Sequence, residues 1–149
     1  MAGITLTRQI AAPVDAVYRE FTDVANVWEK IEAIQKIEML TDGPIRAGTR
    51  FRETRIMFKR EATEEFEVTA VEPNKRFAMT SESCGCRYSM EHRFTPEGSG
   101  TRVDFAMNAK PLTFFAKLMM PLGWLMQGTM KKCIAKDFDQ LKARVEGSA

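Results

Sequence analysis

The side chains best suited to chemistry lie in one alternating stretch, residues 87–95. His92 is the single histidine of the chain. Successive side chains of a strand point to opposite faces, so His92 shares a face with Tyr88, Met90 and Phe94. An imidazole titrates near neutral pH, so His92 beside the Tyr88 phenol could act as a general acid or base on a carbonyl-bearing ligand. The alternative is a histidine in a cavity wall, satisfied by one hydrogen bond.

Glu53 and Arg55 place a carboxylate and a guanidinium on one face of a second alternating stretch, residues 49–58. If this face, which also carries Phe51, points inward, the two charges pair or grip a polar ligand group, because unpaired buried charge is costly. The opposite face has an equal share of apolar residues, so a solvated charge ladder between strands is the alternative. The same alternatives apply to Glu64 on the following stretch.

Methionine and aromatic side chains dominate the expected inner faces. Flexible thioethers adapt to varied apolar ligands, although ordinary core filling also explains them. Trp28 could close the mouth of a pocket or anchor a short helix. The candidate ligand contacts are Trp28, Phe51, Glu53, Arg55, Phe66, Phe77, Met79, Tyr88, Met90, His92, Phe105, Met107, Met126 and Met130.

The three cysteines give no sign of a metal site or a disulfide framework. Cys84 and Cys86 flank a glycine, but no further ligands are evident for zinc, and Cys133 lies on an apolar stripe. The sequence also contains no glycine-rich phosphate loop and no serine nucleophile elbow. We therefore expect neither a metal nor a cofactor.

Composition predicts one domain, residues 1–149, because 149 residues with 44% hydrophobic content suffice for a single core. The net charge of +2, from 22 basic and 20 acidic residues, disfavours nucleic acid and anionic lipid as partners. The chain has no signal-like start and no apolar run of about 20 residues, so we expect a cytoplasmic protein without membrane insertion.

The order of elements indicates how these side chains are positioned. Residues 4–10 alternate as a strand, and two short helical pieces follow, the first beginning near Pro13 and the second capped by Asp23. A further strand leads to a turn at Asp42-Gly43-Pro44. Short turns then separate five strand-like runs, residues 49–58, 62–71, 76–83, 87–95 and 101–109, which predicts an antiparallel meander.

A long apolar segment follows Lys110-Pro111 and ends near Val145, with apolar residues every three or four positions. Pro121 and Gly123 interrupt this segment, so they either kink a continuous helix, which we favour, or separate a first piece around residues 114–120 from the rest. One sheet and one long helix bury their apolar faces against each other, so the helix should lie across the sheet. That arrangement predicts a pocket between the two elements.

The arrangement resembles the helix-grip fold of the START and Bet v 1-like superfamily, in its polyketide cyclase/dehydrase-like branch. The resemblance rests on residues 10–18 (IAAPVDAVY), 23–28 (DVANVW), 43–44 with 48–51 (GTRF), and 71–77 (VEPNKRF). It implies an α+β fold in which a curved antiparallel sheet of about seven strands wraps on a long C-terminal helix, with two short helices after the first strand. Members of the superfamily bind lipids, sterols, hormones or polyketides between sheet and helix.

Three functions fit this fold. The first is a carrier or sensor that holds a small apolar molecule. The second is a cyclase or dehydratase-type enzyme in which His92 and Tyr88 are catalytic. The third is a protein-interaction domain that uses exposed Phe114-Phe115 and Met119-Met120. The sequence leaves enzymatic activity undecided and allows a monomer or a homodimer.

Overall fold

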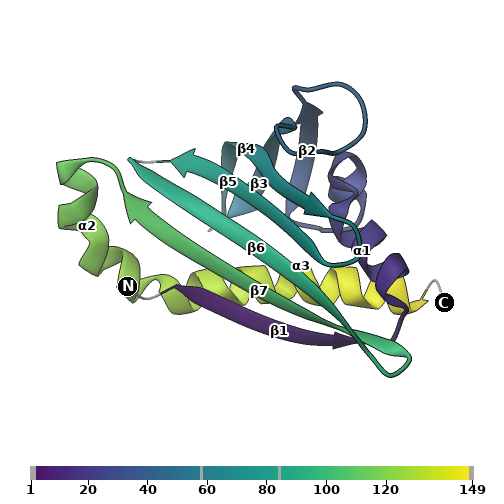
Figure 1. The fold of residues 1–149 in the computed structure, drawn as a ribbon. Coiled ribbons are helices and arrows are strands. Elements are labelled where there is room, and N and C mark those ends of the chain that lie inside the picture. Colours follow the sequence, from purple (N-terminus) through teal and green to yellow (C-terminus); the bar gives the residue numbers. More distant parts are fainter. Residues whose placement is uncertain (1–2, 58, 84, 148–149) are drawn as a thin grey trace.

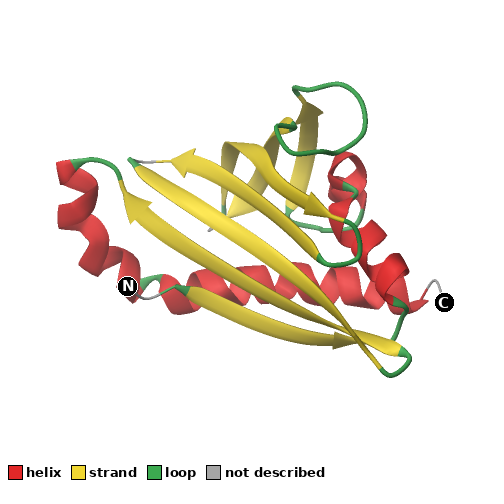
Figure 2. Cartoon of the chain, in the orientation of Figure 1, coloured by secondary structure: helices red, strands yellow, loops and turns green. Residues whose placement is uncertain are grey.

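The alternation of apolar and polar residues is realised as strands in nearly every predicted stretch. The computed structural model describes residues 3–57, 59–83 and 85–147 (Figures 1 and 2). Its elements are β1 (Ile4–Ile10), α1 (Val14–Thr22), the 3-10 helix η1 (Val24–Glu29), β2 (Ile34–Met39), β3 (Arg50–Met57), β4 (Arg60–Glu72), β5 (Arg76–Ser83), β6 (Cys86–Glu97), β7 (Gly100–Pro111), α2 (Phe114–Leu125) and α3 (Gln127–Gly147).

The seven strands described form one antiparallel sheet in the order β1-β7-β6-β5-β4-β3-β2. Strands β3 to β7 are the predicted meander, and β2 extends it by pairing with β3. Strand β1 joins the far edge by pairing with β7, with Ile4 opposite Met107 and Ile10 opposite Thr101. Lys59 and Asn74 adopt positive φ in two of the hairpin turns, where the chain must reverse tightly. The structure confirms the predicted α+β architecture, including the two short helices after the first strand.

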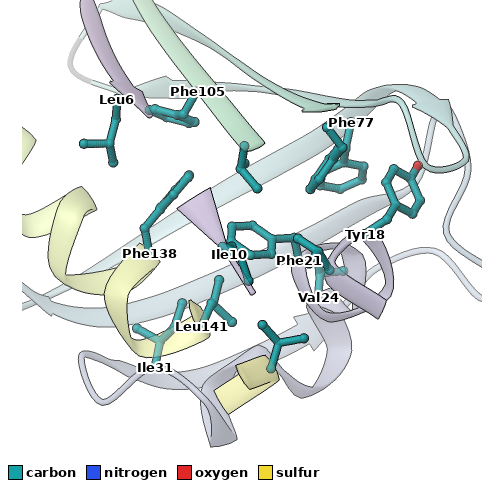
Figure 3. Close-up of a cluster of buried hydrophobic side chains, with 14 of the residues drawn as sticks. Leu6, Ile10, Tyr18, Phe21, Val24, Ile31, Phe77, Phe105, Phe138 and Leu141 are labelled. Atoms are coloured by element: carbon teal, nitrogen blue, oxygen red, sulfur yellow. The ribbon is translucent and has the colours of Figure 1, made fainter. Parts of the chain in front are cut away.

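Helix α3 crosses one face of the sheet, and α1 covers one end of that face (Figure 1). The C-terminal half of α3 buries Phe138, Leu141 and Val145. Phe138 packs edge-on against Phe21 of α1, with ring centroids 5.3 Å apart. Figure 3 shows side chains from α1, β1, β7 and α3 meeting in this cluster. The core is therefore concentrated where helix, sheet and α1 come together.

The outer face of the sheet carries the predicted type of charge ladder. Arg50 pairs with Glu65 on the neighbouring strand, and Arg76 pairs with Glu91 at 2.8 Å. Arg102 on β7 lies 2.9 Å from Asp104. These arginines are partly exposed and each is paired with a carboxylate on the same face.

The C-terminal segment is separated into two helices, which is the alternative to the favoured kink, and the break lies beyond Pro121 and Gly123. Both residues lie inside α2, and the helix ends at Leu125. The amide of Met126 donates to the Gly123 carbonyl at 3.1 Å, a tight three-residue return that ends one helix before α3 begins. The C-terminal segment is consequently two helices, and α2 projects beyond the end of the sheet opposite α1 (Figure 1).

Candidate functional site

A cavity of about 230 Å³ lies between the inner face of the sheet and α3. Its wall is mostly apolar, and one part of it is polar. Residues of α1, η1 and the loop after it close one side, including Phe21, Val24 and Ile31. The predicted contacts that line it are Phe51, Glu53, Arg55, Phe66, Met79, Tyr88, Met90, His92, Phe105, Met107 and Met130.

Three predicted contacts are not among the residues lining this cavity. Phe77 is 1% exposed and packs in the core beside Tyr18, at the end of the sheet that α1 covers (Figure 3). Met126 is 46% exposed, because the chain breaks there between α2 and α3 instead of continuing along the sheet. The backbone of Trp28 belongs to η1, but its side chain lies outside the described residues.

A second depression of about 600 Å³ lies on the surface between the edge strand β1 and α3. Thr5, Thr7, Lys131 and Lys132 border it. It is an open groove, whereas the interior cavity is sheltered and contains convergent polar groups. We therefore take the interior cavity as the candidate site.

Strand β3 turns its Glu53 face inward, which decides the question that the sequence left open. Arg55 Nε lies 2.7 Å from Glu53 Oε1, and its guanidinium also reaches Asp137 Oδ2 of α3 at 3.0 Å. All three side chains are at most 16% exposed. Asp137 is thus a partner that sequence reasoning missed. Its signal was present, because a carboxylate within the apolar stripe of an amphipathic helix needs a buried partner.

Glu64 adds a third carboxylate to the same wall. It is the cross-strand neighbour of Glu53 and accepts a hydrogen bond of 3.2 Å from the Ser81 hydroxyl. Burial raises the pKa of Glu64, and the charge of Glu53 raises it further. Ser81 was not predicted either, since a serine in a strand carries no distinctive pattern. We call Glu53, Arg55, Glu64, Ser81 and Asp137 the polar cluster.

The polar cluster has fewer positive than negative charges. Burial raises the pKa of Asp137, although Arg55 opposes this shift. Burial also lowers the pKa of Arg55, but the charges of Glu53 and Asp137 more than compensate, so the pKa is raised overall. One guanidinium therefore faces three carboxyl groups. The cluster can accept hydrogen bonds from a ligand hydroxyl or amine, and it disfavours a ligand carboxylate.

His92 sits in an aromatic box rather than beside a charged partner. Its ring stacks on Phe138 with centroids 5.6 Å apart and contacts Phe105 at 4.9 Å. Its Nδ1 lies 3.3 Å from the Phe77 carbonyl oxygen, which can only accept, so Nδ1 carries the hydrogen. Among the described residues Nε2 has no hydrogen-bond partner, and it is an acceptor on a side chain that lines the cavity.

Burial lowers the pKa of His92 to about 4. At neutral pH the imidazole is therefore uncharged, and it is a weak base and a negligible acid. Tyr88 is four residues away on the same strand, which corresponds to about 13 Å along the chain. The two candidate catalytic side chains lie at separate places in the cavity wall and do not share a proton.

Within the described ranges, no three acidic, histidine or cysteine side chains converge in a way that would hold a metal ion. Cys86 and Cys133 are free and half-buried, and Cys84 lies outside the described residues. No helix of the described chain is both long and apolar enough to cross a bilayer.

An antiparallel sheet curved over a C-terminal helix, with a sheltered cavity between them, defines the helix-grip class of START-like domains. The chain belongs to the polyketide cyclase/dehydrase and lipid transport family, whose family model matches residues 1–146.

Solved structures share this fold at low sequence identity. Protein TTHA0849 of Thermus thermophilus is 24% identical, with a TM-score of 0.78 and 99% of each chain covered. The Zhui aromatase/cyclase of Streptomyces sp. R1128 is 15% identical, with a TM-score of 0.73 over 97% of this chain and 93% of its own. A START superfamily protein of Mycobacterium smegmatis is 12% identical, with a TM-score of 0.76 and 99% of each chain covered. No curated protein matches the chain.

Proposed function

We propose that the protein is a carrier or sensor that holds a small, mostly apolar molecule in the interior cavity. The observation that carries this proposal is a sheltered, largely apolar hollow with a single polar cluster in its wall. Its volume of about 230 Å³ is slightly below the range of about 300–1,000 Å³ typical of small-molecule sites. The ligand is accordingly small, or it enlarges the cavity by moving flexible side chains.

Methionines supply that flexibility. Met79, Met90, Met107 and Met130 line the cavity from three strands and from α3. An unbranched thioether changes rotamer at low cost, so the wall can adapt to ligands of different shape. The aromatic side of the wall is stiffer, because Phe105, Phe138 and His92 are packed against one another.

The polar groups orient the ligand. The carboxyl oxygens of Glu64 and Asp137 and Nε2 of His92 can each accept a hydrogen bond from a ligand. A ligand that presents hydroxyl or amine groups satisfies them, whereas a carboxylate adds repulsion to an already acidic wall. We infer a neutral or cationic ligand with an apolar body and at least one donor.

The geometry favours this function over the cyclase or dehydratase alternative. General acid–base catalysis works best when the catalytic pKa is near the working pH, and burial moves the pKa of His92 to about 4. The separation of His92 from Tyr88 also leaves no pair that could pass a proton directly. A neutral imidazole that orients a bound molecule fits the site better.

The proposal is tested by binding of an apolar fluorescent amine, N-phenyl-1-naphthylamine, and by native mass spectrometry of protein purified from its own host. Met107→Trp fills the cavity and should weaken binding at least about tenfold. Ile56→Trp adds the same bulk at an exposed position of β3 and should leave affinity unchanged. Equal affinity of both folded variants, with no co-purified small molecule, would refute the proposal.

A further inference from the structure

The helix α2 carries an apolar face that the rest of the described chain leaves uncovered. Six large side chains of α2 are between 40% and 82% exposed: Phe114, Phe115, Leu118, Met119, Leu122 and Leu125. At about 100° per residue they fall within an arc of about 140°. An apolar stripe of this width normally faces a core. Here it faces outward, and we call it the α2 face.

The helix is attached through its opposite side. Ala116 is buried, and its amide donates a hydrogen bond of 3.1 Å to the Thr113 hydroxyl. The Leu112 amide donates to the Gly85 carbonyl at 2.7 Å, which ties the start of α2 to the hairpin between β5 and β6. The α2 face is thus held in a defined direction at one end of the molecule (Figure 1).

The segment of the chain that contains α2 carries charged side chains of one sign only. Residues 105–136 contain five lysines, at positions 110, 117, 131, 132 and 136, and no aspartate or glutamate. All five lysines are exposed, and none forms an ion pair with a residue that the structure describes. The arginines of the outer sheet face, in contrast, are paired with carboxylates. The net charge of +2 hides this segregation, because the segment carries +5 and the rest of the chain −3.

We propose that α2 docks the protein on an anionic lipid surface. The α2 face would lie among the acyl chains near the headgroups, and the unpaired lysines would face the acidic headgroups. A second copy of the chain fits less well, because apposing two α2 faces would bring together two segments that each carry +5 without a single acidic residue. The helix is too short to span a bilayer, so docking is peripheral. This inference does not depend on the cavity.

The test is co-flotation of the full chain with phosphatidylcholine vesicles, with and without phosphatidylglycerol. We expect binding only to vesicles that contain phosphatidylglycerol. The affinity should fall at least about tenfold from low salt to about 1 M salt, because salt screens the charges of the lysines. Phe115→Ser/Leu118→Ser and, separately, Lys117→Gln/Lys131→Gln should each weaken binding at least about tenfold.

Matched control variants make the result specific. Leu40→Ser/Ile56→Ser removes apolar side chains of 43% and 41% exposure elsewhere, and Lys59→Gln/Lys75→Gln removes two exposed lysines elsewhere. Both controls should bind like the unmodified protein, and a thermal melt confirms that all variants fold. Three results would each overturn the proposal. The first is that the protein binds neither kind of vesicle, and the second is that the α2 variants bind as well as the unmodified protein. The third is that the protein does not bind vesicles but sediments as a dimer, which the Phe115→Ser/Leu118→Ser variant abolishes.

Discussion

Replacing Arg55 by methionine removes the only cation that the structure shows within the polar cluster and keeps most of the side-chain volume. Arg55 lies 2.7 Å from Glu53 and 3.0 Å from Asp137, and all three side chains are at most 16% exposed. Two unit charges about 4 Å apart attract by about 4 kcal/mol at an effective dielectric constant of about 20. Desolvation offsets part of this attraction in the intact cluster, but the variant leaves carboxylates buried without a partner.

We expect Arg55→Met to lower the free energy of unfolding by about 3–5 kcal/mol at pH 8, the usual cost of removing one member of a buried pair. The loss should shrink as the pH falls. Without Arg55, the folded-state pKa of the remaining carboxyl groups rises above the unfolded values near about 4, so the folded state binds protons more readily than the unfolded state. The destabilisation by Arg55→Met is therefore fully present above the folded-state pKa of these carboxyl groups and absent below their unfolded-state pKa.

The assay is urea unfolding of the variant and the unmodified protein at pH 8 and at pH 5, followed by circular dichroism. Arg52→Met is the matched control, because Arg52 lies on the same strand but on the outer face, 40% exposed and 3.2 Å from Glu38. It should cost less than about 1 kcal/mol. If Arg55→Met and Arg52→Met cost the same, or if the loss at Arg55 is identical at both pH values, our reading of the polar cluster is incorrect.

Single substitutions at three other sites test the remaining parts of the structure. Glu64→Gln should raise the free energy of unfolding relative to the unmodified protein at pH 8 and lose that advantage toward pH 4. The reason is that burial raises the pKa of Glu64, so its charged form destabilises the folded state. Unfolding titrations at both pH values measure the difference, and a difference that does not change with pH would contradict this prediction. The folded pKa of His92, about 4, lies below the ordinary 6.5, so stability should fall by up to about 3 kcal/mol as the pH drops through that window. His92→Phe should flatten this part of the curve, and NMR titration of the imidazole should find a pKa below about 5; a value near 6.5 would rule the explanation out. Gly85→Ala should destabilise the protein by about 1–3 kcal/mol, because Gly85 has φ +75° and an added Cβ would lie 2.7 Å from the Thr113 hydroxyl. A thermal melt measures the destabilisation. An unchanged melting temperature would show that the turn does not require glycine.

The strands were predictable because each one is a local pattern. Alternation and turn residues placed β1 and β5 at their observed bounds and the other strands within a few residues. The turn between β6 and β7 is shorter than predicted, because Pro96 and Glu97 continue β6 and leave a two-residue loop. Pro96 pairs with Thr101 near the end of the ladder, a position at which a strand tolerates a residue without an amide hydrogen.

The polar cluster was only partly predictable, because it joins residues far apart in the sequence. Alternation showed that Glu53 and Arg55 share a face, but both faces of β3 carry apolar residues, so the pattern could not say which face is inward. In the structure the inward face is the one with Glu53 and Arg55, and Asp137 on another element supplies the second partner of Arg55. A pair of positions on strand and helix has no common period that sequence inspection could detect.

The cavity itself follows from how unevenly α3 is covered. Its C-terminal half buries Phe138, Leu141 and Val145, because α1 and the sheet close on it from two sides. Toward its N-terminus Met130 and Ile134 are only half-buried and face the hollow, since α1 does not reach that far and α2 turns away at Met126. Helix α3 is therefore fully buried only along its C-terminal half, and the hollow lies beside the half-buried residues nearer its N-terminus. The break at Met126, beyond which the α2 face is exposed, lies at the same end of α3 as this hollow.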